Sequence, residues 1–358
     1  MSPRIKAVAN KCSGCGNDMV FSPDTQSVSC PSCNTSKKIK DSTTYSKHDV
    51  TNKSELTDKN TSWANQTKNM ECPNCAAKVI LNNYQASSKC PYCTTDLIAS
   101  IEKFNGLKPD AIIPFSFSKE KAASVFKERL ATKAFISKKI KNSITTNEIC
   151  GYYFPVFMFD AESSTVYNGR LYENYTVKDK DGNSETKRRY FDISGHKISK
   201  HNQIEIEASS KLHQMEMSLI KPFNKHQLKA YQDDYVFGYE LEYYNNSILD
   251  CYNQAKRIME GEIKQGILFN YKYDGIDFFD MNSTFTNPKY SYVFYPMYRI
   301  NFSHNGKTYS NIMNGQTGAI CGDYPKSAGK IALAVLGGIL GFLLVFLIPT
   351  LFILFAFL

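Results

Sequence analysis

The sequence predicts an α+β protein with two small four-cysteine modules, a mixed antiparallel-sheet and helix domain, and one C-terminal transmembrane helix. Three observations lead to this prediction. Eight of the eleven cysteines fall into two copies of one spacing. Residues 101–324 alternate between strand-like and helix-like apolar patterns. The chain then ends in an uncharged apolar run. At 358 residues, the chain is long enough for several domains.

The two cysteine modules share one spacing. Each reads C-x2-C, then fourteen residues, then C-x2-C, and each cysteine of the second module lies sixty residues after its counterpart. Four thiolates in two such knuckles can hold a tetrahedral Zn²⁺ at Zn–S distances of about 2.3 Å. The sequence therefore predicts ribbon 1 (residues 12–33) and ribbon 2 (residues 72–98). Each binds one zinc ion, two in all, through Cys12, Cys15, Cys30, Cys33, Cys72, Cys75, Cys90 and Cys93.

Four thiolates fill every position of a tetrahedral ion, so these sites are expected to be structural and not catalytic. The intervening residues suffice for a hairpin, whose apolar strands are expected at 19–21 and 79–81. Each ribbon is too small to fold by burial alone, so metal binding is expected to supply roughly 10–16 kcal/mol. Iron in a rubredoxin-like site is the alternative, and zinc is favoured because no second redox motif accompanies the cysteines.

The segments around the ribbons are polar. Residues 1–11 form a tail that is too short and too polar for a secretory signal core, which favours a reducing compartment where thiolates stay available for metal. Residues 34–71 are rich in Ser, Thr, Asn and Lys and hold only scattered apolar side chains. Such a composition cannot bury a core, so it predicts a flexible linker.

Residues 101–324 predict a cytoplasmic α+β domain. Strands are expected at 111–117, at 151–161, and in a hairpin around the turn signal KDKDGNSE. Helices are expected after the N-cap residues Ser118 and Ser247, with Gly266 closing the second. Pro155 indicates an edge strand or a bulge. The stretches YFPVF (153–157) and FYPMY (294–298) are similar, which fits either an internal duplication or two aromatic strands with like packing needs.

The C-terminal run from Ile331 to Leu358 has no charged side chain. A bilayer core takes about 20 apolar residues in a helix, so this run predicts one tail anchor. Pro349 kinks its outer part, and Gly337 and Gly341 form a G-x3-G spacing that permits homodimerisation through the helix. Lys326 and Lys330 precede the run, which places the N-terminal body in the cytoplasm.

Other classes of function have little support in the sequence. The formal charge of +9 is compatible with nucleic acid or anionic lipid but indicates neither. The hairpin of ribbon 1 carries two aspartates and no basic residue, unlike most nucleic-acid ribbons. No phosphate-binding loop, no G-x-S-x-G motif and no ligand-spaced histidine group is present, so no catalytic residue is assigned.

The order of motifs resembles a family of uncharacterised bacterial proteins described as TFIIB-type zinc-ribbon proteins. The similarity lies in the two ribbons, followed by GLKPDAIIPF (106–115), GYYFPVFMFDA (151–161), EASSKL (207–212) and MNGQTGAICGDYPKS (313–327). The family tends to have Trp where this chain has Phe157 and Tyr298. The resemblance implies a bacterial origin and a shared fold but no activity. A primosomal-helicase label carried by some members finds no phosphate-binding loop here.

These observations predict a membrane-anchored, zinc-binding, non-enzymatic adaptor at the cytoplasmic face of the membrane, with a protein partner of unknown identity. The alternative is a membrane-tethered nucleic-acid-binding zinc-ribbon protein. An enzyme with its site in residues 101–324 is a third hypothesis.

Overall fold

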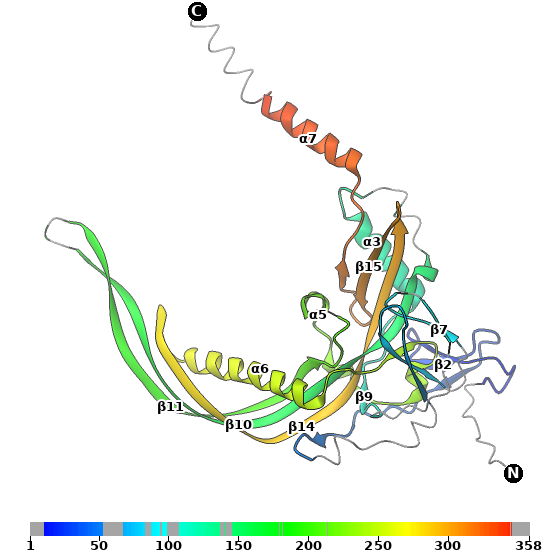
Figure 1. Ribbon diagram of the computed structural model, residues 1–358, viewed down its shortest axis with the longest axis horizontal. Helices are drawn as coiled ribbons and strands as arrows, with labels where there is room; N and C mark the ends of the chain where they lie inside the picture. Colours follow the sequence, from blue (N-terminus) through cyan, green and yellow to red (C-terminus); the bar gives the residue numbers. More distant parts are fainter. Residues whose placement is uncertain are drawn as a thin grey trace, which may run out of the picture.

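The computed structural model describes residues 11–52, 67–82, 87–93, 95–98, 107–136, 140, 145–178, 180, 182–212, 214–343 and 345. Over these residues the chain is a mixed α+β protein with two N-terminal four-cysteine clusters, as the sequence predicts. The ribbons lie at one end of the body, and a long curved arm of β-strands extends from it on the other side (Figure 1). The helix α7 (Ala328–Phe342) projects separately from the body.

The body is organised around two very long strands, β10 (Ile149–Lys178) and β14 (Gly275–His304), which pair antiparallel along most of their length. β11 (Ser184–Glu207) pairs with β10, and β15 (Lys307–Asn314) pairs with β14. Within the described residues the sheet has 11 strands. Its shorter members are β4 (His48–Asp49), β5 (Thr67–Glu71), β6 (Lys78–Asn82), β9 (Ala111–Ile112), β12 (Lys229–Ala230), β13 (Glu240–Glu242) and β16 (Ile320–Gly322).

Two copies of a β-α-β-β unit make up this body. The first comprises β9, α3 (Lys119–Ala131), β10 and β11, and the second comprises β13, α6 (Ile248–Leu268), β14 and β15. The copies exchange their first strands, because β9 pairs in parallel with β14 and β13 pairs in parallel with β10. The two aromatic stretches that the sequence shows as an echo occupy equivalent places in β10 and β14. The duplication is therefore the better of the two explanations.

Pro155 and its counterpart Pro296 lie in central strands, so the expectation of an edge strand at Pro155 is wrong. Each proline stands where one neighbouring strand ends and the next begins. β13 pairs with β10 up to Tyr153, and β11 starts pairing at Val156. The carbonyl of Pro155 accepts a bond from Ala208 N at 3.1 Å, and that of Pro296 accepts one from Gly315 N at 2.8 Å. The missing proline N–H therefore removes no ladder bond from the sheet.

The helices begin where their N-caps predict. Ser118 caps α3, and Ser247 caps α6 by accepting a bond from Asp250 N at 3.1 Å. α6 continues two residues past the predicted end at Gly266, to Leu268. Its apolar face is buried on the sheet and includes the fully buried thiol of Cys251. The short helices are α5 (Gln214–Ile220), η1 (Thr146–Glu148), η2 (Lys225–Gln227) and η3 (Asp233–Val236).

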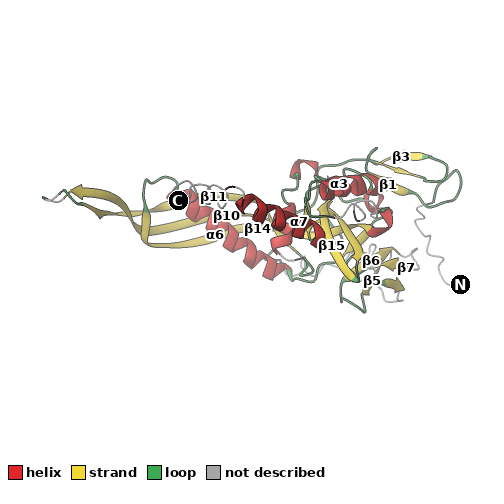
Figure 2. Ribbon diagram, turned by 90° about the horizontal axis from the view of Figure 1, so that it is seen from above, coloured by secondary structure: helices red, strands yellow, loops and turns green. Residues whose placement is uncertain are grey.

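The arm consists of the outer parts of β10, β11 and β14, over residues 162–178, 184–201 and 275–286. α6 lies along its concave face, and the view from above shows the three strands running out past the helix (Figure 2). Leu171 and Ile193 of the arm are buried against Leu268 at the end of α6. This helix-on-sheet contact holds the inner part of the arm in one position.

Residues 34–52 differ from the flexible linker that their composition predicts. They form β3 (Ser36–Lys38) and β4 and run along the body, where Val50 is 2% exposed. The contacts involve the backbone and polar side chains: Ala230 N donates to Ser42 O at 2.7 Å, and Lys229 Nζ donates to the Asp41 carboxylate at 2.7 Å. A scarcity of apolar side chains does not prevent a segment from binding a sheet through its main chain. Residues 53–66 of the predicted linker lie outside the described residues.

Candidate metal centres

The four cysteines of ribbon 1 converge on one point. Their sulfur atoms all lie within 4.8 Å of one another, with 3.4 Å between Cys12 and Cys33 and between Cys15 and Cys30. The hairpin of β1 (Val20–Ser22) and β2 (Ser27–Ser29) brings the two knuckles together, and β3 completes a three-stranded sheet. The predicted apolar strand at 19–21 thus overlaps β1.

Ribbon 2 repeats this arrangement. Its sulfur atoms also lie within 4.8 Å of one another, with 3.4 Å between Cys72 and Cys93 and 3.5 Å between Cys75 and Cys90. Here β5 and β6 form the hairpin, and β7 (Ser87–Lys89) pairs with β8 (Asp96–Ile98). The structure therefore brings together all eight cysteines that the sequence singles out, in two groups of four.

Both groups fit a four-coordinate zinc ion. Zn–S bonds of about 2.3 Å place tetrahedral sulfur atoms about 3.8 Å apart, close to the separations in both clusters. Thiolates are soft ligands that favour Zn²⁺ over hard cations such as Mg²⁺. Each cluster offers four sulfurs and no place for a bound water, so its chemistry is structural.

A threonine supports one thiolate in each site, and the sequence reasoning missed it. The hydroxyls of Thr35 and Thr95 lie 3.2 Å from the sulfurs of Cys33 and Cys93. The hydrogen bond from Thr35 lowers the pKa of Cys33 to about 6. Burial opposes the same effect at Cys93, yet the bonds from Thr95 lower its pKa to about 6. The sequence does contain a pattern that indicates these threonines, because C-P-x-C-x-T occurs in both ribbons, sixty residues apart.

Ribbon 1 packs on the body through the aromatic side chain of its hairpin. The ring of Phe21 contacts those of Tyr235 and Tyr239, with centroids 5.5 and 6.4 Å away. Phe21 N also donates to Phe237 O at 2.9 Å. Cys15 and Cys33, in contrast, are exposed.

Ribbon 2 is joined to the body by strand pairing as well as by side-chain contacts. Its strand β6 pairs with β13, so the ribbon continues the central sheet. Tyr92, which lies inside the second knuckle, donates a hydrogen bond to Glu242 of β13. The guanidinium of Arg299 in β14 lies over the Tyr92 ring at 4.4 Å from its centroid. The metal site and the core of the body therefore share one buried cluster of side chains.

Glu242 is the acidic member of this cluster and is 1% exposed. Burial raises its pKa to about 7, although hydrogen bonds from Ser209 and Tyr92 act in the opposite direction. Because the fold favours the protonated carboxyl, the stabilisation from Glu242 is fully present below its ordinary pKa of 4.5 and is lost as the pH rises through about 7.

We therefore expect Glu242→Gln to flatten the pH dependence of stability. Between pH 6.0 and 8.5 the free energy of unfolding of the wild type should fall relative to that of the variant by roughly 1.4 kcal/mol, because about one pH unit of this window lies below the raised pKa. Urea unfolding of both zinc-loaded proteins measures the difference, in which the shared effect of pH on the thiolates cancels. Glu185→Gln, at an exposed site on β11, is the matched control. Parallel pH profiles for wild type and Glu242→Gln would contradict this expectation.

The predicted anchor residues are described in part. Ile331, Gly337 and Gly341 lie in α7, where a side chain at either glycine would meet nothing. Pro349 and Leu358 lie outside the described residues. Among the helices of the described ranges, none has the length and apolar character needed to cross a membrane.

The fold and the two clusters define a class: a mixed α+β protein with two N-terminal four-cysteine sites that can each bind a metal ion, most simply zinc. The chain is similar to the uncharacterized protein YdjG of Bacillus subtilis (strain 168). The two are 26% identical over 335 residues, which cover 93% of this chain and 94% of that protein. No protein-family model matches the chain. No solved structure matches it either.

Proposed function

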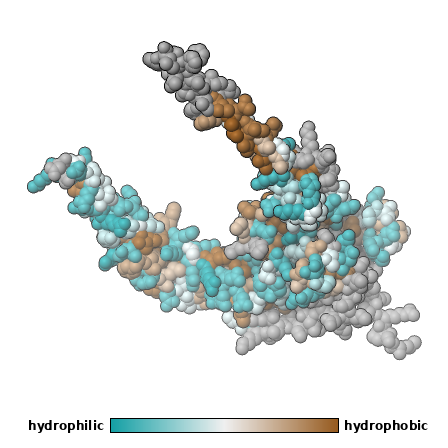
Figure 3. All heavy atoms as spheres, turned by 45° about the horizontal axis from the view of Figure 1, so that its top comes forward, coloured by the Kyte–Doolittle hydropathy of each residue, from teal (hydrophilic) through white to brown (hydrophobic). Residues whose placement is uncertain are grey.

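We propose that the protein is a membrane-attached interaction protein whose two N-terminal ribbons are each folded by one zinc ion. One observation carries the attachment: α7 leaves the body as an exposed apolar helix. Its large side chains are open to the surroundings on every side, and Leu333 is 72% exposed. The space-filling view displays this helix as an apolar column outside the hydrophilic body (Figure 3). Apolar surface of this extent marks a contact with lipid or protein.

The root of α7 supports the same proposal. Ser327 N donates to Phe135 O at 2.7 Å, and the ammonium of Lys330 donates to Ile136 O at 2.9 Å. These bonds tie the start of the helix to the segment that follows α3. With Lys326, Lys330 places positive charge at the body side of the apolar run, which favours a cytoplasmic body in the proposed topology.

A chain that ends at Gly329 tests the attachment. We expect the full-length protein to sediment with membranes and to resist extraction by carbonate, whereas the shortened chain stays in the supernatant. Leu333→Lys combined with Leu340→Lys keeps the length but interrupts the apolar run, so it should weaken retention as well. A shortened chain that still fractionates with membranes would show that residues 330–358 are not the only attachment.

The adaptor role is tested by comparing proteins that co-purify with the full chain and with its Cys72→Ser variant. Loss of a defined partner in the variant supports recruitment through ribbon 2, and an unchanged set counts against it. Nuclease treatment of both samples separates protein contacts from the alternative, nucleic-acid binding. Nucleic-acid contacts would also weaken steeply with salt.

A further inference from the structure

Three side chains on the arm form an arrangement outside the metal centres. The hydroxyl of Ser163 in β10 lies 3.0 Å from Nε2 of His201 in β11. Nδ1 of the same imidazole lies 3.2 Å from a carboxylate oxygen of Glu262 in α6. Ser163 is 2% exposed and His201 is 4% exposed, while the Glu262 side chain is 53% exposed. A hydroxyl, an imidazole and a carboxylate in this order constitute the arrangement of a nucleophilic serine site.

The carboxylate fixes the role of each ring nitrogen. With Nδ1–H donating to Glu262, Nε2 carries the lone pair and accepts the hydroxyl hydrogen of Ser163. His201 is then oriented as a base toward the serine oxygen. A buried histidine with two satisfied nitrogens is also a common structural element, so further features must distinguish the two roles.

The first such feature is the backbone that delivers His201 to this face. The pairing of β10 with β11 shifts by one residue between Phe159 and Ala161, and Gln203 there has a φ of 56°. β14 shifts register at the same level, where Asn287 has a φ of 49°. A shift of one residue exchanges the two faces of a strand, so without the bulge His201 would point away from α6. Paired bulges with left-handed, non-glycine residues are concentrated near functional sites.

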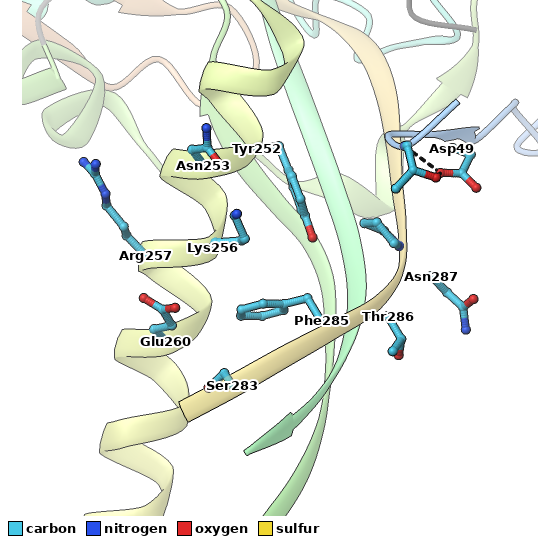
Figure 4. A pocket seen from close by; sticks show the side chains of 12 residues that line it. Asp49, Tyr252, Asn253, Lys256, Arg257, Glu260, Ser283, Phe285, Thr286 and Asn287 are labelled. Carbon is cyan, nitrogen blue, oxygen red and sulfur yellow. Dashed lines mark hydrogen bonds between the residues drawn. The ribbon is translucent and has the colours of Figure 1, made fainter. Parts of the chain in front are cut away.

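The second feature is a groove beside the three side chains. A cavity of about 970 Å³ lies between α6 and β14, and Figure 4 shows Phe285 reaching across it from β14 toward the helix. Phe285 is the direct cross-strand partner of Ser163, and its ring centroid lies 6.1 Å from that of His201. Tyr252 lines the same groove from α6. Phe285 therefore lines the groove and also lies beside Ser163 and His201.

We propose that Ser163 is the nucleophile of an acyl-transfer site that hydrolyses carboxylic esters bound in this groove. Its oxygen forms a bond to the acyl carbon while its proton passes to Nε2 of His201. The imidazolium returns that proton to the leaving alkoxide as the ester C–O bond breaks. Water then repeats the step on the acyl-enzyme, releasing the carboxylic acid and restoring the serine. This inference is independent of the proposed membrane attachment.

The arm contains its own control. Ser164, the next residue of β10, lies 2.7 Å from Nε2 of His196 on the opposite, exposed face. No carboxylate of the described residues is hydrogen-bonded to the second nitrogen of His196. Ser164 is therefore a control within the same protein, because it lies close to a histidine that has no carboxylate partner among the described residues.

The test is covalent labelling of the full chain with a fluorophosphonate probe, which forms an Oγ–P bond and releases fluoride at activated serines. Mass spectrometry of the labelled wild type should map the adduct to Ser163. Ser163→Ala should lose the label, His201→Asn should slow labelling by roughly 100-fold or more, and Ser164→Ala should label like the wild type. Phe285→Ala opens the groove and should speed labelling, a readout that does not depend on how Ser163→Ala folds. No adduct on the wild type, or an adduct at any other serine, overturns the proposal.

Discussion

Cys72→Ser is expected to remove the metal from ribbon 2 and to release this ribbon from the body. The substitution leaves three thiolates, and structural zinc sites of this kind contribute roughly 10–16 kcal/mol of folding free energy. The β5–β6 hairpin cannot replace that contribution by burial, because its apolar cluster consists of only a few side chains such as Val79 and Leu97. With the knuckle unfolded, Tyr92 leaves its place between Glu242 and Arg299.

Limited proteolysis measures this loss directly. We expect rapid cleavage within residues 67–98 of the variant under conditions in which the wild type is stable. Cys321→Ser is the matched control, since Cys321 is a half-buried thiol of β16 that belongs to neither cluster. Equal protection of the Cys72→Ser and Cys321→Ser proteins would show that the metal does not hold ribbon 2 in place.

Asn314→Leu is expected to cause the second large effect, this time on the body. Asn314 is completely buried and donates through its amide nitrogen to Ile220 O at 2.9 Å. Its amide oxygen accepts bonds from the backbone nitrogens of Gln316 and Thr317, at 2.8 and 3.0 Å. Leucine leaves these backbone groups without a partner, at a cost of about 1–3 kcal/mol for each buried group. We expect a total loss of about 3 kcal/mol, or roughly 6–12 °C in Tm.

Thermal unfolding of the zinc-loaded proteins checks this value. Asn282→Leu makes the same chemical change at an exposed position of β14 and should stay within about 0.5 kcal/mol of the wild type. If Asn314→Leu unfolds at the same temperature as Asn282→Leu, the amide does not organise the turn after β15.

The metal ligands could be predicted from the sequence because a four-thiolate site requires closely spaced residue pairs. The C-x2-C knuckles place both thiols of a pair within one turn, and the short hairpin brings the two pairs together. The N-caps Ser118 and Ser247 could be predicted for a similar reason, since a cap acts within three residues. The duplicated strand pattern was visible, but the exchange of β9 and β13 between the two units depends on contacts far apart along the chain.

The other sites depend on such distant contacts as well. Ser163, His201 and Glu262 come from three elements, and only the bulge at Gln203 places the imidazole beneath α6. The histidine therefore forms no recognisable spacing with its partners in the sequence. The docking of Tyr92 on Glu242 joins residues 150 positions apart. The docking of residues 34–52 on the body could not be predicted from composition, because it depends on backbone and polar side-chain contacts with residues far along the chain.

The central claim is that both four-cysteine clusters are zinc sites that fold the two N-terminal ribbons. Elemental analysis of the purified chain tests it most directly. The account predicts two zinc ions per chain in the wild type, with one lost in Cys12→Ser and one in Cys72→Ser. It also predicts a colourless protein, since iron bound to four thiolates absorbs visible light. Fewer than two zinc ions per wild-type chain, or iron in their place, would contradict the account.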